Sequence, residues 1–206
     1  MAYVIEAKDL SDFKSAHLPQ TKTLRNGAVV VLDAARPEHA AAMRDILNVV
    51  IKEGMTYPHE EELTEGGFRQ YFLSHASFSV TIQSIPAAAK AGEWAAFQEG
   101  DVVGCYYIKP NFPGRSSHIC NAGFLTHNLA QGQGVGRFMS SWFVPLAKEL
   151  GYQASFFNLV YVTNERSLAL WRTMGYAEIG RVPKAGRLSN GEYVDAIQFY
   201  KDFSTC

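Results

Sequence analysis

The stretch Asn128–Met139, "NLAQGQGVGRFM", decides the fold, because it places three glycines at alternate positions between two segments of different pattern. Before it, the apolar run over 117–126 is typical of a strand, and after it residues 134–149 follow helical spacing with an interruption near Pro145. Glycines this dense indicate that another group approaches the backbone closely. A strand, a glycine loop and a helix in this order predict a ligand site at the helix N-terminus.

The stretch can be compared with several phosphate-binding loops. A dinucleotide fingerprint, G-x-G-x-x-G, requires a glycine where Arg137 stands, and no acidic residue ends the following strand. A Walker loop requires a Gly-Lys-Ser/Thr sequence, which does not follow the glycines. A flexible connector is the simplest structural alternative. The spacing Gln131-x-x-Gly134-x-Gly136 instead resembles the Q/R-x-x-G-x-G/A signature of the GNAT N-acetyltransferases.

The resemblance has a physical reason. A helix N-terminus leaves N–H groups unpaired and carries a partial positive charge, and glycines let these groups converge on a phosphate. The resemblance implies that acetyl-CoA is the co-substrate and that its pyrophosphate binds at this loop. The residues expected to bind it are Gln131, Gly132, Gln133, Gly134, Val135, Gly136 and Arg137.

The remaining patterns predict an α+β protein with one mixed sheet. Residues 1–26 are expected to be an N-terminal lead-in, and 27–206 a single domain. Strands are expected at 27–35, 77–85, 117–126 and 154–162, with two more around a Gly100-Asp101 turn and two around an Asn190-Gly191 turn. Helices are expected at 37–52, roughly 59–73, about 134–149, and from Thr163 or Asn164 to Gly175.

The composition excludes several classes of partner. Nineteen Lys and Arg residues against twenty Asp and Glu residues give a formal net charge of −1, so no global basic field is present to hold a nucleic acid. The N-terminus lacks the apolar core of a secretory signal, and no apolar run approaches the roughly 20 residues of a membrane span. We therefore expect a soluble, cytoplasmic protein without nucleic-acid or membrane partners, with a mitochondrial location left open.

Metal binding is not expected. The three cysteines, Cys105, Cys120 and Cys206, form no C-x-x-C pair. His118 and Cys120 are alternate residues of one expected strand with no third ligand nearby in the sequence. His59 in "HEEE" lacks the second histidine of H-E-x-x-H.

Longer stretches resemble one subfamily more closely. The strings "YIKPNFPGRSSHICNAGF", "FFNLVYVTN", "EGMTYP" and "GRVPKAG" look like the fungal L-azetidine-2-carboxylate N-acetyltransferases, and the similarity covers about 24–202. It implies a GNAT fold, in which about four helices flank a mixed, mostly antiparallel sheet with a splayed strand pair at the acetyl-CoA site. It also implies acetylation of small cyclic imino acids, such as azetidine-2-carboxylate and cis-4-hydroxyproline, in proline-analogue detoxification. A homodimer is the assembly that this resemblance predicts.

Three asparagines are candidate site residues. Asn121 and Asn158 lie in strands expected to be central, where asparagine is disfavoured and its amide must find partners. Amide donors are suited to hold a carboxylate without burying an arginine. By resemblance, Asn121 and Asn158 match asparagines of the substrate pocket, and Asn164 matches one near the acetyl-CoA and the amine. A structural bracket at the two strand positions and a helix N-cap at Asn164 are the alternatives.

The strand before the glycine loop contributes its backbone to the expected site. In the GNAT fold this strand pairs with the pantetheine arm, so the resemblance assigns Phe124 and Leu125 to that region. Gly123 in the same strand allows a bulge or a close approach, or is an ordinary strand glycine. Tyr57, between the first two helices, is expected to close over the substrate, with simple packing as the alternative. Lys109 stands beside a proline-containing turn and is expected to be solvated.

Trp171 departs from the family pattern. Many members place a tyrosine there to protonate the leaving thiolate, and an indole N–H cannot act as an acid near neutral pH. Water held by Asn164 is the first candidate for handling the proton, which makes Asn164 the expected catalytic residue; Tyr161 and Tyr57 are weaker candidates. Two other functions stay open: an acetyltransferase for a different small amine, and a non-catalytic acyl-CoA-binding regulatory module.

Overall fold

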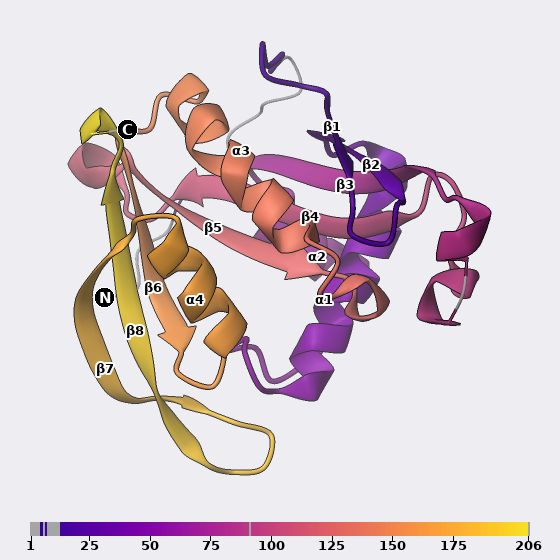
Figure 1. The fold of residues 1–206 in the computed structure, drawn as a ribbon. Helices are drawn as coiled ribbons and strands as arrows, with labels where there is room; N and C mark the ends of the chain where they lie inside the picture. Colours follow the sequence, from indigo (N-terminus) through magenta and orange to yellow (C-terminus); the bar gives the residue numbers. More distant parts are fainter. Residues whose placement is uncertain (1–4, 6, 8–12, 91, 206) are drawn as a thin grey trace.

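One mixed sheet of eight strands forms the centre of the protein, in the order β1-β2-β3-β4-β5-β6-β8-β7 (Figure 1). The computed structural model describes residues 5, 7, 13–90 and 92–205. The strands are β1 (Gln20–Thr23), β2 (Val29–Ala34), β3 (Ala76–Ser84), β4 (Val102–Pro110), β5 (Ile119–Thr126), β6 (Ala154–Tyr161), β7 (Ala177–Arg187) and β8 (Tyr193–Asp202). Every neighbouring pair is antiparallel except β5 and β6, which are parallel. This confirms the predicted mixed, mostly antiparallel sheet.

The parallel pair β5–β6 is short. Its ladder joins Ile119 to Ala154 and Cys120 to Ser155, and it goes no further. On its other side β5 stays paired with β4 as far as Thr126. The two strands therefore separate after Cys120, which confirms the predicted splayed pair and leaves one edge of the β5 backbone without a strand partner.

Four α-helices in the described part of the chain cover the sheet, and their bounds are α1 (Ala40–Glu53), α2 (Glu65–Phe72), α3 (Val135–Glu149) and α4 (Glu165–Thr173). Figure 1 shows α1 and α2 behind the sheet and α3 and α4 in front of it. Alternation along β4 explains this arrangement. Cys105 and Tyr107 pack in the cluster that contains α1 and α2, whereas Tyr106 and Ile108 pack in the cluster under α3.

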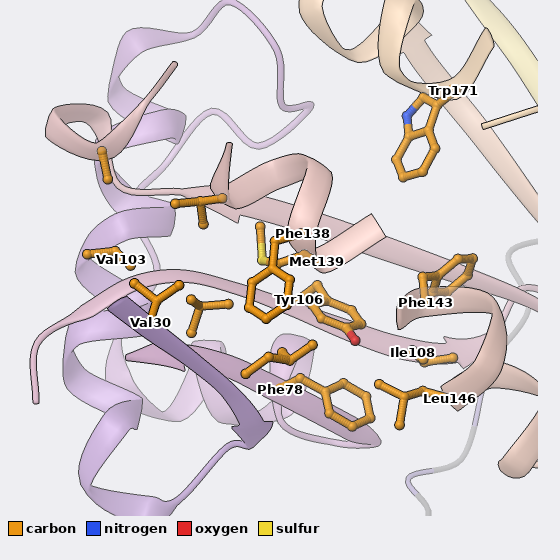
Figure 2. Packing of buried hydrophobic residues seen from close by; sticks show 14 of the residues in the cluster. Val30, Phe78, Val103, Tyr106, Ile108, Phe138, Met139, Phe143, Leu146 and Trp171 are labelled. Atoms are coloured by element: carbon orange, nitrogen blue, oxygen red, sulfur yellow. The ribbon is translucent and has the colours of Figure 1, made fainter. Parts of the chain in front are cut away.

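Helix α3 supplies much of the larger core. Its buried Phe138, Met139, Phe143 and Leu146 lie over residues of β3 and β4 (Figure 2). The predicted interruption near Pro145 is wrong, because the helix runs through Pro145 to Glu149. Phe143 and Leu146 are fully buried on either side of the proline, and their packing favours a continuous helix despite the missing N–H.

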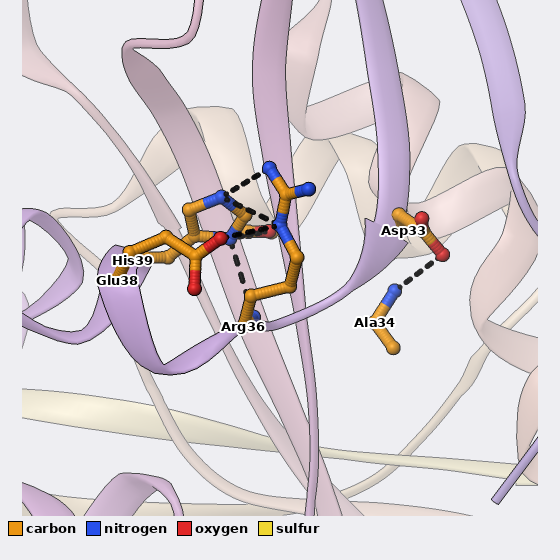
Figure 3. Close-up of polar contacts among 6 residues, drawn as sticks. Asp33, Ala34, Arg36, Glu38 and His39 are labelled. Carbon is orange, nitrogen blue, oxygen red and sulfur yellow. Dashed lines mark hydrogen bonds and ion pairs between the residues drawn. The ribbon is translucent and has the colours of Figure 1, made fainter.

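Helix α1 starts at a buried histidine. His39 ends a 3₁₀ turn, η1 (Pro37–His39), and its Nδ1 lies 2.8 Å from Oγ of Ser79 on β3. Arg36 donates its backbone N–H to the same Nδ1 at 3.3 Å, and its guanidinium lies between His39 and Glu38 (Figure 3). Burial, and secondarily the charge of Arg36, lower the pKa of His39 below its usual value.

The structure corrects the prediction in three places. The sheet begins earlier than 27–35, because β1, which lies inside the segment expected to be a lead-in, pairs with β2. The described residues do not form the first of the two strands predicted around Gly100-Asp101, and this part of the chain instead contains two 3₁₀ turns, η2 (Ala87–Ala89) and η3 (Gly92–Ala96). Helix α2 begins at Glu65 rather than near 59, because the hydroxyl of Thr64 caps it by accepting from Gly67 N–H.

No helix in the described part of the chain has both the length and the apolar character needed to cross a bilayer.

Candidate functional site

A cleft of about 680 Å³ opens where β5 and β6 separate. It is bordered by both strands, the glycine loop, the start of α4 and the loop before α2. The sequence-predicted residues that line it are Tyr57, Asn121, Phe124, Leu125, Gln131, Gly132, Gly134, Val135, Gly136, Arg137, Asn158 and Asn164. Gln133 is the one predicted residue that does not line the cleft, and its carbonyl accepts from Arg25 N–H at 3.3 Å.

The glycine loop owes its shape to two left-handed residues. Gly132 has φ 77° and Gly134, the N-cap of α3, has φ 100°. A Cβ at either position would meet nothing within 4 Å, so backbone conformation and not space requires glycine here. The loop thereby brings the N-terminus of α3, where the first N–H groups lack an intrahelical partner, to the border of the cleft, which fits the binding of a phosphate.

Three arginines add charge to this end of the cleft. Arg137 lies in the first turn of α3, and Arg25 and Arg166 reach the loop from the β1–β2 turn and from α4. Arg25 donates to the Gly132 carbonyl at 3.1 Å, and Arg166 donates to the Gln131 side chain at 2.7 Å. Sequence reasoning missed Arg25 and Arg166, because only the tertiary fold brings them to the loop. Together with the helix N-terminus they fit a pyrophosphate.

Three tyrosines lie at another part of the cleft wall. The Tyr71 hydroxyl is 3.3 Å from the hydroxyls of both Tyr57 and Tyr107. A Cβ on Gly123 would stand 2.5 Å from the Tyr57 hydroxyl oxygen. Glycine at this strand position therefore leaves room for the tyrosine side chains to pack against the β5 backbone. Burial raises the pKa of Tyr57 and Tyr107 well above the usual value, so both stay neutral and can donate hydrogen bonds.

Lys109 is not solvated as predicted. Its Nζ lies 4.3 Å from the ring centroid of Tyr71 and 4.4 Å from that of Tyr107, and it donates to the Tyr71 carbonyl at 3.4 Å. Burial lowers its pKa to about 8. The ammonium group packs behind the tyrosines, since Lys109 does not line the cleft that they border.

A network of three amides joins the predicted Asn121 and Asn158 to Asn111, which the sequence reasoning missed. Asn121 Nδ2 donates to the Phe156 carbonyl at 3.0 Å and to Asn111 Oδ1 at 3.2 Å. Asn158 Nδ2 donates to Asn111 Oδ1 at 2.6 Å, and Asn111 Nδ2 donates back to Asn158 Oδ1 at 3.1 Å. The signal available in the sequence was an asparagine directly after β4, ten residues before Asn121.

Asn164 and Trp171 border the cleft from α4. Asn164 Oδ1 accepts from Ser167 N–H at 3.2 Å, so the residue is the N-cap of α4 while still lining the cleft. Trp171 is buried and its ring lies 4.4 Å from Phe157 and 5.1 Å from Phe124, centroid to centroid. The indole therefore packs in the core at the cleft floor.

Tyr161 is the other predicted candidate for handling a proton. It lines the cleft and is buried, with burial raising its pKa. Its ring lies so close to Gly186 that a Cβ there would stand 2.3 Å from the ring. Among the residues that the structure describes, no group of three or more His, Cys, Asp or Glu is placed to hold a metal.

Sequence comparisons place this chain among acetyltransferases. Residues 57–176 match the sequence model of the acetyltransferase (GNAT) family. The N-acetyltransferase aca1 of Schizosaccharomyces pombe is 33% identical over 171 residues, which are 82% of this chain and 82% of that protein. The protein SPT10 of Saccharomyces cerevisiae is 33% identical over 107 residues, which are 52% of this chain but 17% of that protein.

Solved structures share the fold. A GCN5-related N-acetyltransferase from Kribbella flavida superposes with a TM-score of 0.72 at 25% identity, covering 84% of this chain and 97% of that one. The putative acetyltransferase yncA from Salmonella typhimurium, solved with its cofactor acetyl-CoA, has a TM-score of 0.69 at 15% identity, covering 84% of this chain and 94% of that one.

Proposed function

Because the chain belongs to the GNAT family and is an acetyl-CoA-dependent N-acetyltransferase, we propose that its acceptor is a small cyclic imino acid, such as azetidine-2-carboxylate or cis-4-hydroxyproline. The observation that carries this proposal is a set of neutral hydrogen-bonding side chains, which we call the acceptor wall: Tyr57, Tyr107, Asn121 and Asn158. Such groups suit a compact zwitterion, whose nitrogen and carboxylate need one partner each. The resemblance to the fungal L-azetidine-2-carboxylate N-acetyltransferases supports the same acceptor.

In the proposed reaction the bound zwitterion first loses one of its two N–H protons to water, and the neutral ring nitrogen then attacks the carbonyl carbon of the thioester. A C–N bond forms and the C–S bond breaks. The remaining proton of the nitrogen passes to water, and the departing thiolate takes up a proton to leave as free CoA thiol. Asn164 holds the water through its Nδ2, because its Oδ1 is already engaged in capping α4.

The rest of the cleft positions the two reactants. We assign the glycine loop, 131–137, with Arg25 and Arg166 to the pyrophosphate, and the backbone of Phe124 and Leu125 to the pantetheine arm. The acceptor wall holds the imino acid. Since the indole of Trp171 cannot supply a proton, positioning and not acid catalysis provides most of the rate enhancement.

A thiol-release panel tests the acceptor. Purified protein is incubated with acetyl-CoA and one amine at a time, and free thiol is measured. We expect release with azetidine-2-carboxylate and cis-4-hydroxyproline, with kcat/KM at least about tenfold higher than with lysine or spermidine, because spermidine has no carboxylate and lysine carries a long chain with a second charge that the neutral acceptor wall does not pair. Equal or faster release with lysine or spermidine would overturn the proposed acceptor while leaving the acetyltransferase activity intact.

Two further expectations follow from the same resemblance, and a third, the location, follows from the sequence patterns described above. We propose a homodimer, which light scattering of the eluted protein tests directly. We also propose a role in the detoxification of proline analogues and a cytoplasmic location. Cells that lack the protein should then become more sensitive to azetidine-2-carboxylate in the growth medium.

A further inference from the structure

We infer that Asn111 is a positioning residue, which acts on the acceptor by fixing the directions of the Asn121 and Asn158 side-chain amides. Asn111 is not among the residues that line the cleft, whereas Asn121 and Asn158 both are. Its effect on the acceptor must therefore pass through those two side chains. The inference rests on the proposed function, since it concerns the same acceptor wall.

A backbone carbonyl determines the orientation of the first of the three amides, that of Asn121. The Phe156 carbonyl can only accept a hydrogen bond, so the group of Asn121 that lies 3.0 Å from it must be Nδ2 and not Oδ1. The other hydrogen of this Nδ2 points to Asn111 at 3.2 Å, so Asn111 must present its Oδ1 there. One main-chain group thus settles the orientation of two amides.

The orientation of the third amide, that of Asn158, follows from the orientation of the Asn111 amide. Because Asn111 Oδ1 accepts from Asn121, its Nδ2 must lie on the side of Asn158 Oδ1, and the two residues form a reciprocal pair at 2.6 and 3.1 Å. The backbone of Asn111 is itself fixed, since its N–H donates to the Ile119 carbonyl at 2.8 Å. The short turn between β4 and β5 therefore holds the centre of the network in place.

The network determines which groups remain for the acceptor. Both hydrogens of Asn121 Nδ2 are used, so Asn121 offers its Oδ1, which has no hydrogen-bond partner among the described residues. Asn158 keeps one N–H, because a single hydrogen of its Nδ2 is engaged. One hydrogen-bond acceptor on Asn121 and one hydrogen-bond donor on Asn158 complement an imino acid that carries an N–H beside a carboxylate. This differs from the expectation that both asparagines donate to the carboxylate.

A double-mutant cycle on KM tests the inference. We expect Asn111→Leu to raise the KM for azetidine-2-carboxylate by about tenfold, as loss of a bonded amide from a partly buried network does, with the KM for acetyl-CoA unchanged. In an Asn158→Ala background the same substitution should raise KM by only about threefold, since one of the two side chains through which Asn111 acts is already absent and only the effect through Asn121 remains. Asn111→Ala, which adds no bulk, gives a second measurement if the leucine variant does not fold.

The control is Asn190→Ala, because Asn190 is exposed and its side chain bonds within its own turn, to Glu192. It should change neither KM. Equal effects of the Asn111 substitution in both backgrounds, or an equal rise in the KM for acetyl-CoA, would overturn the positioning role. These outcomes are distinct from failure of the proposed function, which appears in the wild-type protein as the absence of turnover with any imino acid.

Discussion

At the glycines of the glycine loop, two effects that usually occur together can be distinguished: backbone strain and steric conflict. Gly134 has φ 100° with open space where a Cβ would stand. Alanine there costs about 1–2 kcal/mol in conformational energy, because an L-residue is disfavoured in the left-handed region. The loop would relax toward negative φ and turn its N–H groups away from the cleft. We therefore expect Gly134→Ala to raise the KM for acetyl-CoA by roughly tenfold, measured at saturating acceptor.

Gly151 provides a matched control. It has φ 92°, a Cβ there would also meet nothing within 4 Å, and it lies after the C-terminal end of α3, outside the cleft. Gly151→Ala should lower the free energy of unfolding as much as Gly134→Ala does, with an unchanged KM for acetyl-CoA. If both variants changed that KM equally, general destabilisation and not the loop would be the cause.

At the level of elements, the predictions succeeded where a local sequence pattern determines the secondary structure and failed where a tertiary contact determines it. The expected helix over 37–52 corresponds to α1 because its apolar spacing matches a single buried face. The strand β1 has the polar sequence "QTKT" with mostly exposed residues, so it carries no period-2 signal, and pairing with β2 alone makes it a strand. The prediction of a strand before the Gly100-Asp101 turn failed because Trp94 is buried from a 3₁₀ turn, a pattern easily mistaken for a strand.

The site shows the same division. That the glycine loop and the two strand asparagines lie at one cleft was predictable, since glycine spacing and asparagine within a central strand are unusual in the sequence itself. Asn111, Arg25 and Tyr71 were not predictable, because each gains its role from a partner distant in the sequence. Lys109 was predicted wrongly because its neighbours in the sequence suggest a turn, while the rings that bury it come from α2 and β4.

The start of helix α1 should make stability depend on pH. The pKa of His39 is lowered in the folded protein below its usual 6.5, so the unfolded chain binds more protons in the range between the two values. The stabilisation is complete above pH 6.5 and is lost as pH falls through the folded pKa. We expect the free energy of unfolding, from urea titrations at pH 5 to 7.5, to fall with acidification, and His39→Asn to reduce that slope.

His59 and His127 also have pKa values lowered by burial, so part of the slope should remain in the His39→Asn variant. An asparagine at 39 can still accept from the Arg36 N–H, which keeps the start of α1 intact. A variant with the wild-type slope would show that protonation of His39 does not limit stability in this range.

At the scale of the whole molecule, the splay that makes the cleft also weakens the sheet. The ladder between β5 and β6 consists of two residue pairs, so side chains must hold the two halves of the sheet together. Phe143 of α3 does this, with ring centroids 5.5 Å from Phe124 on β5 and 5.9 Å from Phe157 on β6. A fully buried ring thus connects stability to the geometry of the cleft, where we propose that acetyl-CoA binds.

This arrangement predicts that Phe143→Ala affects both properties, although Phe143 does not line the cleft. Removal of the ring should lower the free energy of unfolding by about 3–5 kcal/mol, and the loosened contact between β5 and β6 should weaken acetyl-CoA binding severalfold, measured by calorimetry on the folded protein. Phe78→Ala is the matched control, because Phe78 is equally buried but stacks on Tyr106 within one half of the sheet. It should cost similar stability and leave the acetyl-CoA affinity unchanged; a parallel loss of affinity in both variants would mean that the two halves are not joined through Phe143.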